Sequence, residues 1–520
     1  MYFVQALKRS RQVAATRPST IYGDRQKTWG ETHDRVQRLA ARLADMGVSD
    51  GARVAILSLN NDRYFEMMYA IAWAGGTFVP LNTRWAVPET LYAMKDCDAR
   101  ILCVDESFTA VAAQLQKDYP PLTDVIYLGE GDTPAGMHAH EALAAYAQPM
   151  LIEAPRGGDD VCGIFYTGGT TGHPKGVMLT HDNIIFASLN WLSCLHVSGE
   201  TIYMHVAGFF HLGGASPAFA VALAGGTNVI QSKFEAVPAM QAIQRHKVNY
   251  TLLIPVMVNA MINDPMLEQY DLSSVKMCHY GGSPMPEAVL RGAMAKLPSW
   301  QFFQGYGLTE TSAVLTVLDW KDHLHKGDTA RRLKSAGRCT SGWEIRIVGP
   351  DREELPRGQV GEIAARGAGV MLGYWGKPEA SAALMKDGWL HSGDGAWMDD
   401  DGFIYIVDRL KDMIVTGGEN VFSTEVENAI YQHPDVLECA VVGIPHDQWG
   451  EAVHAVVVAK PGRSLTAQAV IDHCHTLIAN YKCPKSVDIS EDRLPVSPAG
   501  KITKNVIRAR FWEGRERNVN

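Results

Sequence analysis

Apolar and polar positions follow two different periods along the first third of the chain. Between residues 31 and 46 the apolar side chains recur at intervals of three and four, which places them on one face of a helix. Short apolar runs such as 53–57 have the length and composition of buried strands. This alternation is typical of parallel sheets covered by helices. The expected elements are helix 31–46, strand 53–57, helix 62–73, strand 77–81, helix 88–95 and strand 101–104.

The same alternation continues from residue 159 to about residue 348, after which the pattern changes. Segments 359–365 and 402–407 are short and are separated by glycine and aspartate, which is typical of antiparallel strands. A polar, glycine-containing stretch begins near Arg409, so we predict two domains, 1–408 and 409–520. The further elements expected are strand 161–165, a helix end, glycine cap and strand over 223–230, helix 237–246, strand 251–254, helix 425–432, strands 436–442 and 453–458, and helix 467–479.

Composition narrows the function. The 520 residues are 46% hydrophobic and 20% charged, which is an ordinary globular balance. A net charge of −9 argues against nucleic acid as a partner. The sequence has no apolar run long enough to span a membrane and no signal-peptide pattern at its start, so no integral membrane segment is expected. The nine cysteines lack any CxxC pair, which favours free thiols and a cytoplasmic location.

A glycine-rich stretch, YTGGTTGHPKG at residues 166–176, carries the first chemical signal. It follows the expected strand 161–165, and glycines at such a turn let backbone N–H groups approach a ligand closely. The hydroxyls of Thr167, Thr170 and Thr171 add donors, and Lys175 adds a positive charge. A plain surface turn needs one or two glycines and gains nothing from this combination. The stretch therefore suits a polyphosphate.

The Walker A loop is the other phosphate-binding motif to consider, and it does not fit. Pro174 precedes Lys175 and Gly176 follows it, so the second glycine and the Ser/Thr metal ligand of that motif are both missing.

A second signal is QGYGLTE at residues 304–310. Tyr306 offers a flat face for an adenine ring. Thr309 can donate a hydrogen bond to a phosphate, and Glu310 can coordinate Mg²⁺, which takes one or two carboxylates plus phosphate oxygens.

Residues 166–176 resemble the phosphate loop of the adenylate-forming enzymes, YTSGTTGxPKG, at ten of eleven positions. That family contains acyl-CoA synthetases, luciferases and the adenylation domains of peptide synthetases. The stretch around Glu310 resembles the family's YGxTE motif, residues 281–286 (GGSPMP) resemble its GG[AS]P[ML] loop, and residues 75–82 resemble GAxxVPLN. The exception is Gly168, where the family usually has serine. The missing hydroxyl predicts a weaker hold on ATP, by about 1.5–3 kcal/mol at most.

The resemblance implies roles for particular residues. Lys501, in PVSPAGK, resembles the catalytic lysine, with Lys175, Thr309 and Glu310 acting beside it and Glu310 as metal ligand. Asp394 and Arg409 match the residues that contact the ribose hydroxyls, and Lys411 occupies the hinge position. The remaining matches are the nucleotide-binding Thr167, Gly168, Gly169, Thr170, Thr171, Gly172, Gly282, Ser283, Tyr306 and Gly307, the acyl-pocket His211 and Gly281, and the coenzyme A tunnel residues Gly417, Gly418 and Glu419.

The resemblance also implies the fold and the reaction that we expect for this protein. The fold is α/β, with a large N-terminal domain of stacked, mostly parallel, helix-covered sheets plus a small β-barrel-like part, then a small mobile α+β domain carrying Lys501. The reaction is the ATP- and Mg²⁺-dependent activation of a carboxylic acid to an acyl-adenylate, followed by thioester formation with coenzyme A. Small apolar residues at 312–318 favour a medium-chain fatty acid or an aryl acid.

Three alternatives stay open. A stand-alone adenylation enzyme that loads a carrier protein would share these motifs, and so would a luciferase-like oxygenase. A silent nucleotide-binding homologue is the alternative from a different class, although the joint presence of Lys175, Glu310, Asp394, Arg409 and Lys501 argues against it. A homodimer is common in the family, and the residues do not decide this point.

Overall fold

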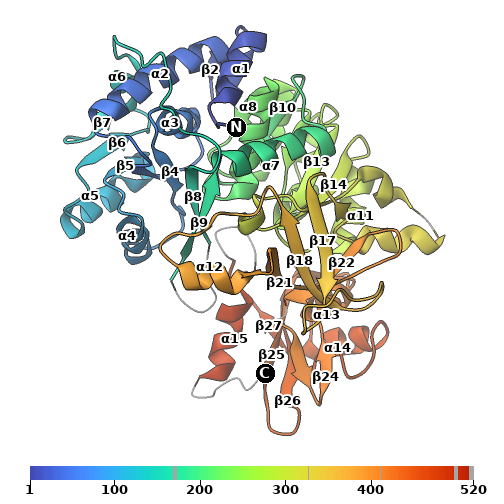
Figure 1. Ribbon diagram of the computed structural model, residues 1–520. Coiled ribbons are helices and arrows are strands. Elements are labelled where there is room, and N and C mark those ends of the chain that lie inside the picture. The colour runs from blue at the N-terminus through green and yellow to red at the C-terminus, as the bar shows by residue number, and fades with distance from the viewer. Residues whose placement is uncertain (168–172, 326, 410–411, 497–501, 514–520) are drawn as a thin grey trace.

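The computed structural model describes residues 1–167, 173–325, 327–409, 412–496 and 502–513 (Figure 1). Within these ranges the strands form four sheets. Two large sheets belong to the first three quarters of the chain, and a smaller one at the C-terminal end forms its own layer with helices α13 to α15, drawn in orange and red. The expected α/β class, with a large N-terminal and a small C-terminal part, is confirmed. No helix among the described residues is long and apolar enough to cross a membrane.

The first large sheet has eight strands in the order β19-β9-β8-β4-β3-β5-β6-β7. The six strands from β8 to the β7 edge (β8, β4, β3, β5, β6 and β7) run parallel. Strands β9 and β19 add an antiparallel edge on the other side. The strands are β3 (Arg53–Leu57), β4 (Thr77–Pro80), β5 (Ile101–Val104), β6 (Asp124–Tyr127), β7 (His138–Ala139), β8 (Val161–Thr167), β9 (Lys175–Thr180) and β19 (Gly373–Tyr374). The helices of this part are α2 (Trp29–Asp45), α3 (Asp62–Trp73), α4 (Val87–Asp96), α5 (Thr109–Asp118) and α6 (His140–Ala144).

The second large sheet has nine strands in the order β16-β15-β14-β13-β12-β10-β11-β1-β2. Its central strands β14 to β1 are parallel. The strands are β1 (Pro18–Tyr22), β2 (Arg25–Thr28), β10 (Ile202–His205), β11 (Thr227–Ile230), β12 (Tyr250–Leu252), β13 (Met277–Gly281), β14 (Gln301–Tyr306), β15 (Thr316–Leu318) and β16 (Arg338–Cys339). The helices of this part are α1 (Gln5–Ala14), α7 (His181–Cys194), α8 (Leu212–Ala224), α9 (Ala236–His246), α10 (Pro255–Ile262) and α11 (Glu287–Lys296).

The two faces of the nine-stranded sheet belong to different clusters of buried side chains. Met204, Cys278 and Phe302 pack with residues of α9, α10 and α11 on one face. The alternate residues, such as Tyr250 and Phe303, pack with Trp191 of α7 on the other. Side chains of a strand alternate between faces, so a buried two-sided sheet requires apolar residues at nearly every position.

The antiparallel part expected from 359–365 and 402–407 is a five-stranded sheet. Strand β21 pairs with β18, β20 and β22, and β17 pairs with β18. Its elements are β17 (Trp343–Val348), β18 (Gly361–Gly367), α12 (Pro378–Leu384), β20 (Met385–Lys386), β21 (Trp389–Met398) and β22 (Ile404–Arg409).

The C-terminal sheet has the order β24-β23-β26-β25, with β27 parallel to β26. The helix expected over 467–479 ends at His475, and the Leu477 side chain beyond it is 43% exposed. The elements are β23 (Ile414–Thr416), β24 (Glu419–Val421), α13 (Ser423–Ile430), β25 (Val436–His446), β26 (Gly450–Ala459), α14 (Ala467–His475), β27 (Ser486–Ser490) and α15 (Lys504–Trp512).

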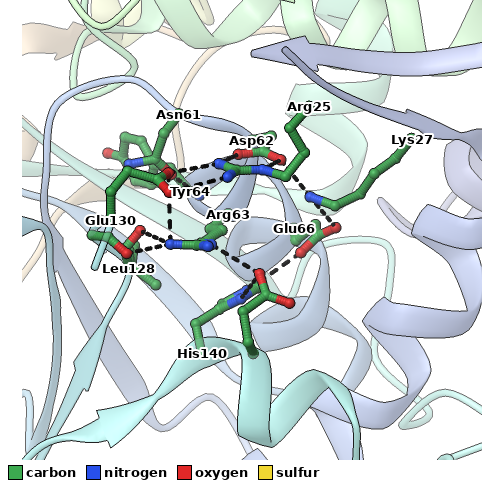
Figure 2. A network of polar contacts seen from close by, with 12 residues as sticks. Arg25, Lys27, Asn61, Asp62, Arg63, Tyr64, Glu66, Leu128, Glu130 and His140 are labelled. Carbon is green, nitrogen blue, oxygen red and sulfur yellow. Dashed lines mark hydrogen bonds and ion pairs between the residues drawn. The ribbon is translucent and has the colours of Figure 1, made fainter. Parts of the chain in front are cut away.

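A buried network of charges joins the two large sheets (Figure 2). Lys27 on β2 forms ion pairs with Asp62 and Glu66 of α3, and its amine lies 3.1 Å from the Glu66 carboxylate. Arg35 of α2 pairs with the same carboxylate at 2.8 Å. Burial opposes ionisation of Glu66, but Lys27, Arg35 and His140 outweigh it and lower the pKa of that carboxyl. The network therefore holds one sheet to the helices of the other only while its carboxylates are charged.

We expect this network to make the protein sensitive to acid. A carboxyl whose pKa is depressed in the folded state contributes stability that is present above its unfolded pKa, about 4.3 for Glu, and lost as the pH falls below it. Glu66→Gln should lower the melting temperature at pH 7, since breaking a buried ion pair costs about 3–5 kcal/mol. The variant should also lose less of its melting temperature than the wild type between pH 5 and pH 3. Glu200→Gln, which breaks the exposed pair with Arg17, is the matched control. Equal effects of both variants would contradict the expectation.

Candidate active site

Two of the motif loops meet at the carboxyl edge of the nine-stranded sheet. Strands β13 and β14 are parallel neighbours, and Gly281 pairs with Gly305 at their ends. A Cβ on Gly281 would lie 2.3 Å from the carbonyl oxygen of Gly305, so the close approach of the two backbones requires glycine there. Gly282, at φ +79°, then turns the chain into the loop that carries Ser283. The carboxyl ends of parallel strands are the usual place for a ligand site in such sheets.

The loop after β14 is held in a strained turn around Glu310. A Cβ on Gly307 would lie 1.5 Å from the carbonyl oxygen of Ala313, so the position admits only glycine. Ser312 and Ala313 have φ values of 55° and 93°, in the region that L-residues rarely adopt. The Glu310 carbonyl accepts a hydrogen bond from the Met371 amide at 2.9 Å. Such backbone strain persists where the surroundings over-determine the conformation, as they do at functional sites.

Tyr374 of β19 brings the two loop systems together. Its hydroxyl donates to the Glu310 carboxylate at 2.7 Å, and the amine of Lys175 lies 5.0 Å from the centre of its ring. Burial and the neighbouring Glu310 charge raise the pKa of Tyr374, so its hydroxyl keeps the proton that it donates. Lys175 begins β9 and pairs with Thr167 at the end of β8, whose hydroxyl donates to the Lys175 carbonyl at 3.4 Å.

We expect Tyr374→Phe to weaken the positioning of Glu310 without unfolding the protein. The change removes one hydroxyl that donates to a charged acceptor, a bond worth about 1.5–3 kcal/mol. The KM for the nucleotide should therefore rise by about tenfold or more in steady-state kinetics at fixed Mg²⁺. Tyr405→Phe removes a similar bond of 3.1 Å to Asp399 and should leave this KM unchanged. An unchanged KM in the Tyr374 variant would show that the contact plays no part in the site.

Asp394, Tyr306 and Arg409 form the second half of the site. Asp394 on β21 pairs directly with Arg409 on β22, and the guanidinium Nε lies 2.9 Å from one carboxylate oxygen. The Tyr306 hydroxyl donates to the other oxygen at 2.7 Å. Burial alone would lower the pKa of Arg409. The neighbouring negative charges, chiefly that of Asp394 with a smaller contribution from Glu310, outweigh this effect, and the pKa of Arg409 is raised.

Asp394 keeps acceptor capacity for a ligand. Its side chain is buried, yet a carboxylate offers about four lone-pair sites, and only two are engaged by the contacts described above. Two vicinal hydroxyls could donate to the others, and charge-assisted bonds of this kind are the strong ones.

The other predicted site residues have no contact described here with Glu310, Tyr374, Asp394 or Arg409. Thr309 is half-buried in the short helix that precedes Ser312, and His211 precedes α8 at the same sheet edge as Gly281. Gly417 and Gly418, at φ 60° and 86°, form the turn of the β23–β24 hairpin, and this turn with Glu419 is exposed. The predicted residues Gly168, Gly169, Thr170, Thr171, Gly172, Lys411 and Lys501 lie outside the described residues.

Both ends of the segment that contains Lys501 are fixed. Val496 pairs with Ile502, and the amide and hydroxyl of Thr503 both donate to the Pro495 carbonyl, at 2.8 and 2.9 Å. Helix α15 begins at the next residue, Lys504.

Lys504 is a largely buried cation that the sequence motifs did not point to. Its amine donates to the Ser423 hydroxyl at 2.6 Å and lies 2.8 Å from the Glu427 carboxylate. The Ser423 hydroxyl and amide in turn donate to Asp408 at 2.5 and 2.7 Å. Asp408 immediately precedes Arg409, so this network connects α15 to the strand that carries Arg409. The sequence offered one signal for Lys504, which is its position three residues after the predicted catalytic Lys501.

No three His, Cys, Asp or Glu side chains gather as a metal site in the part of the chain that the structure describes. Any ion held at Glu310 would therefore share its coordination with oxygen atoms of a substrate.

Comparisons with known proteins agree with this arrangement. The model of the AMP-binding enzyme family matches residues 5–375, and that of the AMP-binding enzyme C-terminal domain matches residues 425–501. A feruloyl-CoA synthase from Amycolatopsis sp is 38% identical over 94% of this chain and 95% of its own length. The fatty acid–[acyl-carrier-protein] ligase ScoC from Streptomyces coeruleorubidus is 33% identical over 99% of this chain and 98% of its own length.

A solved structure shares the whole fold. The o-succinylbenzoate CoA synthetase from Bacillus subtilis, in complex with its acyl-adenylate intermediate, superimposes with a TM-score of 0.84 at 27% identity, covering 99% of both chains. The resemblance drawn from the motifs is thereby confirmed, and the chain belongs to the AMP-binding enzyme family, the adenylate-forming enzymes.

Proposed function

We propose that this protein activates a carboxylic acid with ATP and transfers the acyl group to the thiol of coenzyme A. The observation that carries the proposal is the set of contacts around the loop that follows β14. Tyr374 links Glu310 to Lys175, and Tyr306 links the same loop to Asp394 and Arg409. A carboxylate paired with an arginine suits the ribose, and a lysine beside a second carboxylate suits a polyphosphate with its cation. The names of the relatives support the same reading, since they act on feruloyl, fatty acyl and o-succinylbenzoyl groups.

In the first step an oxygen of the substrate carboxylate attacks the α-phosphorus of ATP, and the bond to pyrophosphate breaks. Negative charge grows on the phosphate oxygens, so positioning and positive charge supply most of the catalysis. Lys175 and the 167–172 loop would hold the leaving pyrophosphate, while Lys501 would bridge the carboxylate and the α-phosphate. Mg²⁺ fits Glu310, because it is commonly held by one or two carboxylates plus phosphate oxygens, and it would neutralise phosphate charge when bound.

In the second step the thiol attacks the acyl carbon, and AMP leaves with the oxygen that joined it to the acyl group. Lys501 cannot occupy the same space as the entering thiol. We propose that residues 409–520 form a unit that rotates about Lys411, so that Lys501 leaves and the Gly417–Gly418 turn arrives with Glu419. The exposure of that turn supports this role, because it leaves the turn free to meet a partner surface.

The acid is a medium-chain fatty acid or an aryl acid in this proposal. Loading of a carrier protein is the second candidate, because the relative ScoC is named as an acyl-carrier-protein ligase and aligns over nearly the whole chain.

Pyrophosphate release from ATP, measured against a panel of carboxylic acids with and without coenzyme A, tests the proposal. We expect release with one class of acid, with multiple turnovers only when the thiol is present. Turnover that needs a carrier protein instead would favour the second candidate. No release with any acid would contradict both.

A further inference from the structure

The core next to the predicted acyl-pocket residue Gly281 contains polar atoms without partners among the described residues. Tyr203 of β10, Tyr250 of β12 and His279 of β13 are 1%, 0% and 3% exposed. Within the described ranges, neither tyrosine hydroxyl has a hydrogen-bond partner, and the same holds for Nδ1 of His279. Buried polar groups are nearly always hydrogen-bonded, and leaving one unsatisfied costs about 1–3 kcal/mol. Three such atoms in one region therefore call for a partner that is absent from the folded chain itself.

These side chains gather on one face of the nine-stranded sheet, against α7. Tyr203 and Tyr250 pair across β10 and β12, and their rings are 5.1 Å apart. Trp191 of α7 lies 5.0 Å from the His279 ring and 6.4 Å from that of Tyr250. The indole N–H of Trp191 already donates to the Ser216 hydroxyl at 2.5 Å. Trp191 therefore adds a flat apolar wall to the cluster and no free donor.

The cluster lies directly below the glycines of the acid site. His279 precedes Gly281 by two residues on the same face of β13. A Cβ on Gly305 would lie 2.2 Å from the His279 ring, so glycine at this position makes room for the ring next to the end of β14. Tyr250 pairs with Met277, four residues before Gly281, which places it about 13 Å further along the strand direction.

Tyr203 also lines a tight gap beside the start of α8. The other residues that line it include His205, Ala207, Gly213, Gly214 and Pro217, and Gly213 follows the predicted acyl-pocket residue His211 by two positions. The lining side chains fill most of it, so a ligand would enter by moving them. Gly213 is exposed, and an added Cβ on it would meet no atom within 4 Å, so the first turn of α8 is open on that side.

The cluster offers neutral hydrogen-bonding groups. Burial raises the pKa of Tyr203 and of Tyr250 well above its ordinary value, so both hydroxyls keep their protons. Burial lowers the pKa of His279 to about 3, so its imidazole is uncharged at neutral pH. An uncharged hydroxyl fits these partners, whereas a second carboxylate or an ammonium group would be buried without a counter-ion.

We propose that the acid activated by this protein is an aryl acid with a hydroxyl group on its ring, far from the carboxylate, and that Tyr203, Tyr250 and His279 bind this hydroxyl. The aromatic walls contributed by Trp191 and Phe303 suit a flat ring rather than a flexible alkyl chain. The inference rests on the proposed function and selects one substrate class within it.

The test compares 4-hydroxycinnamic acid, cinnamic acid and octanoic acid as substrates, by the kcat/KM of pyrophosphate release. The wild-type protein should favour the hydroxylated acid over cinnamic acid by about tenfold or more, because the analogue leaves the buried groups unpaired. The double variant Tyr203→Phe/Tyr250→Phe should bring this ratio close to one while retaining activity with cinnamic acid. Using the ratio for one variant cancels effects on folding and on ATP binding.

Tyr69→Phe is the matched control. The Tyr69 hydroxyl is also buried without a partner among the described residues, but it lies on α3 and its ring stacks on Phe3, in another core cluster. This variant should keep the wild-type ratio. A ratio that is unchanged in the double variant would overturn the inference, since water alone would then satisfy the tyrosines. Release with octanoic acid and neither aromatic acid would overturn it and leave the proposed function intact, whereas no release with any acid would overturn both.

Discussion

Lys501→Ala is expected to lower the rate of acyl-adenylate formation by about a thousandfold or more, while thioester formation from a supplied acyl-adenylate stays within a few-fold of wild type. The resemblance assigns Lys501 the bridge between the attacking carboxylate and the α-phosphate, where charge develops only in the first step. The second step releases AMP and has no need of that bridge. A single substitution should therefore separate the two half-reactions.

The first half-reaction can be measured by exchange of labelled pyrophosphate into ATP, and the second by thioester formation from synthetic acyl-adenylate. Lys460→Ala, an exposed lysine whose amine donates to the Pro434 carbonyl, is the control, and neither half-reaction should change. Equal loss of both half-reactions in the Lys501 variant would contradict the assigned role.

Lys504→Met is expected to have the largest effect on stability among single changes in the C-terminal part. Its side chain is only 16% exposed and is paired with Glu427, which also accepts a hydrogen bond from the Val441 amide at 2.8 Å. Removing one partner of a buried ion pair costs about 3–5 kcal/mol, because the other charge is left uncompensated. The loss should appear as a lower melting temperature and as easier proteolysis of the C-terminal part.

The double variant Lys504→Met/Glu427→Gln separates charge from packing. Neutralising both partners removes the unpaired charge, so the double variant should recover much of the stability that Lys504→Met loses. Arg493→Met, which breaks an exposed arginine's contact with Glu438, provides a comparison at the edge of the same sheet. Two single losses that simply add in the double variant would show that the Lys504–Glu427 pair is not the source of the effect.

The strands and helices that were predicted in the N-terminal third agree with the structure because their signals are local, but α1, β1, β2, α5 and β6 were not predicted. Helix 62–73 and strand 53–57 match the structure residue for residue, since the helix is capped by Asn61 and closed before Gly75. Strand 251–254 was predicted too long. Ile254 is already the residue before Pro255, which starts α10, and a short apolar helix directly after an apolar strand gives no change of pattern.

The motif residues of the site could also be predicted from the sequence, but the contacts that orient their side chains could not. Tyr374 reaches Glu310 across 64 residues of sequence, through the antiparallel edge formed by β19 and β9. The link from Asp408 through Ser423 to Lys504 likewise depends on three elements meeting in space. Periodicity and short motifs report neighbours along the chain, whereas these contacts arise from how the sheets pack.

Transfer of oxygen from the acid to AMP would test the central claim most directly. The acid is labelled with ¹⁸O in both carboxylate oxygens and is incubated with the protein, ATP and coenzyme A. The masses of the nucleotide products are then measured by mass spectrometry. Activation through an acyl-adenylate predicts one labelled oxygen in each AMP, because the oxygen that attacks the α-phosphorus stays there when the thiol displaces AMP. Formation of ADP with the label in inorganic phosphate, or AMP without any label, would contradict the account.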